Sequence, residues 1–152
     1  MLRTLEPEIM DDEHQALVYA QADFSTSNQW YVDHLMADYP DHMRTVVDIG
    51  CGPGDVVLRL AKAHADVCIT AIDGSSPMID LAREAVRTAK LQSRITPVQG
   101  YIPGLALEAE SFDAILSKDL LHHLPDPMVL WNEARRLGRR GERGRLRGRR
   151  HV

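Results

Sequence analysis

The fold of this chain is decided by the stretch Val46-Val47-Asp48-Ile49-Gly50-Cys51-Gly52-Pro53-Gly54. A short β-branched run that ends in glycine predicts a buried strand over Thr45–Ile49. A helix can begin at Asp55, and a second apolar run, residues 67–72, ends at Asp73, 19 residues after Gly54. A strand, a glycine turn, a helix and a strand with an acidic tip are typical of an α/β sheet that presents a site for an adenosine-containing cofactor.

Outside this stretch, apolar runs of strand and helix period continue to alternate along the chain. Pro97 lies inside one of these runs and indicates a strand at the edge of a sheet, because proline lacks an amide donor. In the first helix we expect Leu17, Val18 and Ala22 on one side. The alternation predicts a parallel sheet with right-handed crossovers. The further predicted elements are helices at 12–22, 25–36, 75–89 and 126–137, and strands at 95–98 and 112–116.

Length and composition predict one globular domain. The chain has 152 residues, of which 44% are hydrophobic, and no run of 18 apolar residues that would predict a membrane span. The N-terminus lacks the apolar segment of a secretory signal. We interpret both cysteines, Cys51 in the glycine loop and Cys68 in a buried strand, as reduced thiols. Together these features predict a cytoplasmic protein that does not associate with a membrane.

The charge is distributed unevenly along the sequence. Residues 1–134 carry 21 acidic and 9 basic side chains, whereas residues 135–152 carry 9 arginines and one glutamate. An acidic body disfavours nucleic acid, so we expect nucleic-acid binding only non-specifically through the arginine-rich end.

The chemistry of the glycine loop indicates the kind of ligand. Gly50 and Gly52 allow a sharp turn and close approach to the main chain, and the amides ahead of the next helix are expected to be donors for a carboxylate or phosphate. Asp48 is suited to a cation such as an ammonium or sulfonium. Asp73 is suited to a ribose, because a carboxylate can accept hydrogen bonds from both vicinal hydroxyls. The pattern predicts a ligand with an amino-acid end, a positive centre and a nucleoside end.

At this point the chain resembles the class I S-adenosylmethionine-dependent methyltransferases over roughly residues 9–137. The resemblance is carried by three blocks in register: 47–54, then Ile72-Asp73-Gly74-Ser75-Ser76-Pro77-Met78, then 112–117 with Leu121-His122-His123-Leu124. It implies an α/β Rossmann-like core whose seven strands have the order 3-2-1-4-5-7-6. This sequence supplies the four that form 3-2-1-4, and the last three strands are missing.

The resemblance also implies S-adenosyl-L-methionine as cofactor and a set of binding residues. Tyr101 departs from a position that is commonly acidic, although Tyr101 or Ile102 can still cover the adenine ring. Lys118 departs from the small polar residues common at its position, and a cation beside a sulfonium is unfavourable unless it points away. The implied contacts are Asp48, Gly50, Gly52 and Ser117 to the methionine part, Cys51 through its backbone, Asp73 to the ribose, and Gly74 and Met78 to the adenine.

Sequence identifies no catalytic residue, because methyl transfer needs alignment and exclusion of water more than acid–base chemistry. His122 and His123 are either a base or, as we favour, residues that shape the site, and as sequence neighbours they are poor metal ligands. Cys51 is either a reactive thiol or simply a small residue in a tight loop. Four aromatic residues form either a lid that sets substrate choice or ordinary packing: Tyr19, Phe24, Trp30 and Tyr31.

The sequence after Leu137 breaks the pattern. Residues 138–152 contain seven arginines and four glycines, which cannot form a core. We therefore expect a methyltransferase domain at 1–137, with a helical lid at 10–38 and a cofactor-binding core at 44–137, and a disordered Arg/Gly-rich tail at 138–152. The tail is either an arm for RNA or acidic partners or, as we favour, the product of reading GC-rich DNA out of frame. The strand at 112–116 then has an open edge through which the chain could self-associate.

The function expected from these observations is methyl transfer from S-adenosyl-L-methionine to an unidentified small-molecule acceptor. Because part of the supporting sheet is missing, we expect weak cofactor binding and little turnover. Two alternatives remain open at this point. One is a truncated, non-catalytic fragment that at most binds cofactor, and the other is weak nucleic-acid binding through the tail.

Overall fold

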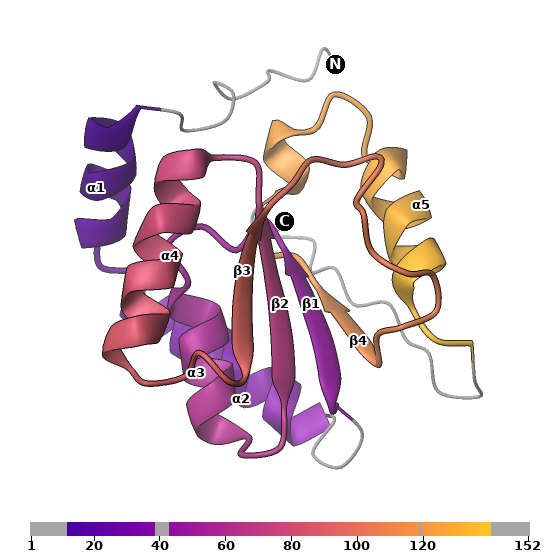
Figure 1. Ribbon diagram of the computed structural model, residues 1–152, viewed down its shortest axis with the longest axis horizontal. Coiled ribbons are helices and arrows are strands. Elements are labelled where there is room, and N and C mark those ends of the chain that lie inside the picture. Colours follow the sequence, from indigo (N-terminus) through magenta and orange to yellow (C-terminus); the bar gives the residue numbers. More distant parts are fainter. Residues whose placement is uncertain (1–11, 39–42, 119, 141–152) are drawn as a thin grey trace.

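The computed structural model describes residues 12–38, 43–118 and 120–140 (Figure 1). Strands and helices alternate after two N-terminal helices, as the sequence predicts. The elements are α1 (Glu13–Gln21), α2 (Ser25–Asp38), β1 (Thr45–Ile49), α3 (Asp55–Ala63), β2 (Cys68–Asp73), α4 (Ser76–Thr88), β3 (Ile95–Gln99), β4 (Ala114–Leu116), a short 3₁₀ helix (Leu121–His123) and α5 (Met128–Leu137).

The four strands form one parallel sheet in the order β3-β2-β1-β4, which confirms the predicted fold class. Asp48 of β1 lies opposite Ala71 of β2 and Leu116 of β4. Pro97 lies in β3, the edge strand, where a missing amide donor costs no ladder hydrogen bond. From β1 the chain continues to β2 and β3 on one side and then returns to β4 on the other side of β1. The strand order therefore reverses between β1 and β4, and the carboxyl ends of these two strands flank that point. Ligands bind at such points in open α/β sheets.

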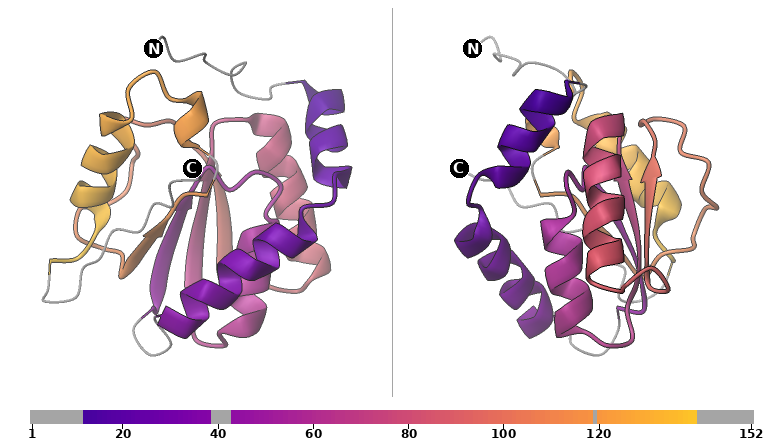
Figure 2. Two further views of the ribbon diagram at one scale, coloured as in Figure 1. Left: turned by 180° about the vertical axis from the view of Figure 1, so that it is seen from behind. Right: turned by 60° about the vertical axis from the view of Figure 1, so that its left-hand side comes forward.

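Helices cover both faces of the sheet (Figure 2). α3 and α4 pack on one face, with α1 and α2 outside them, and α5 packs on the other. Neighbouring residues of β1 therefore point into different cores: Val46 contacts the cluster under α3 and α4, and Val47 contacts the cluster under α5. Both valines are fully buried. A strand buried on both faces explains why the apolar residues Val46, Val47 and Ile49 do not follow the alternating pattern of a half-exposed strand.

One predicted burial is wrong: Cys68 is exposed, because it is the first residue of β2. In α1, Leu17 and Val18 are 45% and 54% exposed, and Ala16 is the buried residue. Among the residues that the structure describes, no helix is long and apolar enough to cross a membrane.

The beginning of the arginine-rich segment continues the fold for three residues. Gly138 forms an isolated parallel bridge with Phe112, and the Arg139 amide donates to the Phe112 carbonyl at 2.9 Å. Arg139 also forms an ion pair with Asp113 at 2.9 Å. Residues 138–140, which the sequence analysis places in a disordered tail, therefore lie along the start of the β4 segment. The remainder of that predicted tail, 141–152, lies outside the described residues.

Candidate functional site

The loop between β1 and α3 is built around glycines with positive φ. Gly50, Gly52 and Gly54 have φ angles of +87°, +55° and +95°. A side chain at Gly50 would also place its Cβ 3.1 Å from the Cβ of Leu120. Since L-residues rarely adopt these angles, the loop conformation requires the glycines that the sequence supplies.

The amides of this loop are used to hold it in place. Those of Gly50 and Cys51 donate to the Ile72 carbonyl at 2.7 and 2.8 Å, and the Gly54 amide donates to the Cys51 carbonyl at 3.2 Å. The prediction that the loop amides serve as donors to a ligand is therefore wrong for these three. The amides of Gly50 and Cys51 join the loop to β2 instead, which fixes the distance between the glycine turn and Asp73, and the Gly54 amide closes a turn within the loop.

Asp73 links the glycine loop to the start of α4. One carboxylate oxygen accepts the Gly52 amide at 2.9 Å, and the other accepts the Ser75 amide at 2.9 Å. Both carboxylate oxygens are therefore oriented by main-chain amides. A carboxylate fixed in this way has the chemistry needed to bind the two vicinal hydroxyls of a ribose.

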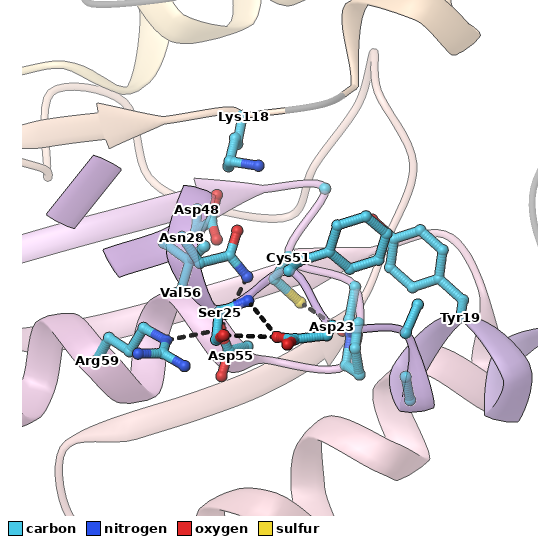
Figure 3. A pocket seen from close by; sticks show the side chains of 16 residues that line it. Tyr19, Asp23, Ser25, Asn28, Asp48, Cys51, Asp55, Val56, Arg59 and Lys118 are labelled. Carbon is cyan, nitrogen blue, oxygen red and sulfur yellow. Dashed lines mark hydrogen bonds and ion pairs between the residues drawn. The ribbon is translucent and has the colours of Figure 1, made fainter. Parts of the chain in front are cut away.

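A cavity of about 180 Å³ lies between the glycine loop and the segment that joins α1 to α2 (Figure 3). Of the predicted cofactor residues, Asp48, Gly50, Cys51 and Gly52 line it. The other lining residues are Tyr19, Ala20, Ala22, Asp23, Phe24, Ser25, Asn28, Pro53, Asp55, Val56, Arg59 and Lys118. The cavity thus begins at the carboxyl end of β1 and β4 and is closed by the N-terminal helices.

The remaining predicted cofactor residues do not line this cavity. Ser117 is buried at the end of β4, and its hydroxyl has no hydrogen-bond partner among the described residues. Met78 is buried, and the Gly74 carbonyl accepts a hydrogen bond from the Gln99 side chain at 3.2 Å. Tyr101 is 53% exposed, and the partly buried Ile102 packs on the core under α5. The roles of these residues, and that of Asp73, stay predictions.

The sequence analysis missed a polar wall of the cavity formed by α2 and α3. The Asn28 amide group donates to Asp55 at 2.8 Å, and Arg59 binds the same carboxylate at 2.7 Å (Figure 3). Arg59 also donates to Gln29 at 2.8 Å, so these groups join α2 to α3. The spacing of Asp55 and Arg59, four residues apart on a predicted helix, was the available signal.

Two of the four aromatic residues proposed as a lid reach the cavity. The rings of Tyr19 and Phe24 lie 5.0 Å apart, and both line it. A Cβ built on Gly52 would lie 3.8 Å from the Tyr19 ring, which places that ring against the glycine loop. Tyr31 is buried in the core and Trp30 is 42% exposed, and neither lines the cavity.

The structure also bears on the candidate reactive groups. Burial raises the pKa of the Cys51 thiol well above its ordinary value, and the nearby charges of Asp48 and Asp73 raise it further. Cys51 is therefore a protonated thiol, which favours its interpretation as a small loop residue. The Nδ1 atom of His123 is buried without a hydrogen-bond partner in the described part of the chain. The side chain of His122 lies outside the described residues.

Residues 46–141 match the family described as "Methyltransferase domain". The ubiquinone biosynthesis O-methyltransferase of Actinobacillus pleuropneumoniae is 34% identical over 90 residues, which cover 57% of this chain and 38% of that protein. The 27-O-demethylrifamycin SV methyltransferase of Amycolatopsis mediterranei is 32% identical over 98 residues, which cover 64% of this chain and 36% of that protein. The chain thus spans less than two fifths of the length of these curated relatives.

A solved structure extends the likeness to the fold. A protein of Methanococcus maripaludis, described as an S-adenosyl-L-methionine-dependent methyltransferase, superposes with a TM-score of 0.79 at 25% identity. The match covers 90% of this chain and 63% of that one. The glycine loop, the acidic tip of β2, the strand order and these matches agree. The chain belongs to the S-adenosylmethionine-dependent methyltransferase family, whose cofactor is S-adenosyl-L-methionine.

Proposed function

We propose that this chain binds S-adenosyl-L-methionine and takes part in methyl transfer to a small-molecule acceptor. The observation that carries the proposal is the fixed arrangement of the glycine loop and Asp73, in which the Gly52 amide donates to the Asp73 carboxylate at 2.9 Å. Because that bond and the bonds to Ile72 hold both groups, the loop and the carboxylate are positioned before a ligand arrives. A site positioned in advance loses less conformational freedom on binding.

The chain's own residues would divide the binding between two ends. Asp73 would accept the ribose hydroxyls, and Asp48, which is buried at the cavity wall, would lie beside the positively charged methionine part. When bound, the cofactor supplies a methyl group on a sulfonium, which is reactive without further activation. The protein must then align an acceptor and exclude water. Tyr19 and Phe24 would contribute to that exclusion by covering the glycine loop.

Two observations favour a small-molecule acceptor. The two relatives described above are named for ubiquinone biosynthesis and for a demethylrifamycin, both small molecules. The acidic body of the chain, 21 acidic against 9 basic side chains over residues 1–134, would repel nucleic acid.

Calorimetric titration with S-adenosylhomocysteine tests the proposal. We expect the native chain to bind and Asp73→Ala to bind at least about tenfold more weakly, because hydrogen bonds to a charged group contribute roughly 1.5–3 kcal/mol. Asp80→Ala is the matched control, since Asp80 is an exposed aspartate of α4 whose carboxylate contacts Arg83. Asp73→Ala also leaves the Gly52 and Ser75 amides without their acceptor, so circular dichroism must show that the variant is folded.

The proposal fails if the native chain does not bind S-adenosylhomocysteine. It also fails if folded Asp73→Ala binds as tightly as Asp80→Ala. Asp73→Asn adds a finer test, because asparagine keeps the size of the side chain but only one of its two acceptor atoms. An intermediate affinity for this variant would support a ribose held by both carboxylate oxygens.

A further inference from the structure

Lys118 brings a positive charge to the cavity from the segment that follows β4. The parallel register pairs Asp48 with Leu116, the last residue of β4, and Lys118 lies two residues beyond that strand. Lys118 is partly buried and lines the cavity together with Asp48 and Gly50. Figure 3 shows its side chain extending from the segment that follows β4 into the cavity, on the side where Asp48 lies. It therefore lies at the end of the cavity where the methionine part of the cofactor is expected.

The two cations that line the cavity have different roles. Arg59 donates to Asp55 at 2.7 Å and to Gln29 at 2.8 Å, so it belongs to the contact between α2 and α3. Lys118 belongs to the opposite wall, where β4 ends and the strand order reverses. Lys118 is thus the cation next to the expected methionine part of the cofactor, whereas Arg59 belongs to the contact between the helices.

A cation at this position has a cost that depends on the acceptor. The proposed cofactor carries a positive sulfonium, and a second positive charge in the same partly buried site repels it and lowers the affinity for the cofactor. The carboxylate of Asp48 offsets part of this repulsion. A negatively charged acceptor oxygen between the two cations would offset the rest, because it attracts both.

We propose that Lys118 selects methyl acceptors that present a negatively charged oxygen, a phenolate or a carboxylate. The proposal rests on the proposed function. The Lys118 ammonium can donate hydrogen bonds to the oxygen and favours its deprotonated form, so the nucleophile arrives without a proton and needs no base. The acceptor oxygen forms the new bond to the methyl carbon, and the carbon–sulfur bond breaks with its electron pair remaining on sulfur. One negative and one positive charge are neutralised together.

The test uses para-nitrophenol, whose yellow phenolate reports its own protonation, and the near-isosteric neutral para-nitroaniline. Both are titrated into the full chain saturated with S-adenosylhomocysteine. We expect the native chain to prefer the phenolate about fivefold or more over the aniline and to lower the apparent pKa of the bound phenol. Lys118→Met should lose both effects, and Lys118→Arg should keep them because it keeps the charge. Lys62→Met, at an exposed position of α3, is the matched control and should behave as native.

The outcomes separate this inference from the function on which it rests. Absence of S-adenosylhomocysteine binding would refute the proposed function. Normal binding of S-adenosylhomocysteine with no phenolate preference, or with a preference that survives in Lys118→Met, would overturn the role of Lys118 alone. If Lys118 serves only as a structural partner of Asp48, its removal would change stability or S-adenosylhomocysteine affinity and leave the ratio of the two probes unchanged. That result also overturns the proposal.

Discussion

Replacing Gly50 with alanine tests whether two effects exclude a side chain from this position, the positive φ of the backbone and the close contact with Leu120. At φ +87°, an L-residue costs about 1–2 kcal/mol relative to glycine. The new Cβ would also lie 3.1 Å from the Cβ of Leu120, and a Cβ cannot rotate away as the end of a side chain can. Relief requires a shift of the Leu120 backbone, which adds about 1–3 kcal/mol. We expect Gly50→Ala to lower the free energy of unfolding by roughly 2–5 kcal/mol.

Gly104 provides the matched control for this measurement. Its φ of +102° imposes a similar strain, but an added Cβ would meet no atom within 4 Å. Gly104→Ala should therefore cost only the strain, about 1–2 kcal/mol. Urea unfolding followed by circular dichroism gives both values, provided that the slopes with denaturant agree. Equal losses of stability in the two variants would contradict the argument, because they would show that the contact with Leu120 contributes nothing.

Two further predictions concern charge and the α2–α3 contact. Burial raises the pKa of Asp113, but hydrogen bonds from the Thr45 and Arg44 amides and the charge of Arg139 outweigh it and leave that pKa lowered. The contribution of the Asp113 carboxylate to the free energy of unfolding is present above the ordinary aspartate pKa of about 4 and is lost as the pH falls through the lowered pKa. Asp113→Asn should therefore flatten the acid side of a profile of stability against pH. An unchanged slope in this variant would count against the argument. Asn28→Ala should lower the free energy of thermal unfolding by about 1–3 kcal/mol, because Asn28 is buried and donates to Asp55. The control Asn132→Ala, at an exposed position, should change it by less than about 0.5 kcal/mol. Equal effects would contradict the role of Asn28 in the contact between α2 and α3.

The elements were predictable because their signals are local. A β-branched run closed by glycine, as at Thr45–Ile49, carries its own evidence of a buried strand. Ser75 and Pro77 likewise mark the beginning of α4, where the Ser75 hydroxyl accepts the Met78 amide at 3.3 Å. Burial at the ends of elements was not predictable in this way. Cys68 is a residue type that is usually buried, and its exposure follows only from its place as the first residue of β2.

The residues that line the cavity also divide into those predictable from local sequence and those that depend on packing between distant segments. Asp48, Gly50 and Gly52 were predicted to bind the cofactor because the loop chemistry is contained in one stretch of sequence, and the structure places them in the cavity wall. Asn28 and Arg59 were not predicted, because their contribution depends on how α2 packs against α3 across residues far apart in the chain.

By itself, the sequence determined the alternation of strands and helices, the positions of the glycine turn and the acidic tip, and hence the family. These depend on periodicity, on positive φ and on the hydrogen-bonding capacity of single side chains, all of which act over a few residues. Tertiary structure alone decided that the loop amides bind Ile72, that Tyr19 covers Gly52, and that Lys118 faces the same cavity as Asp48. The physical reason is that these contacts arise from the parallel register of β1 and β4 and from the packing of the N-terminal helices, which join segments that are distant in sequence.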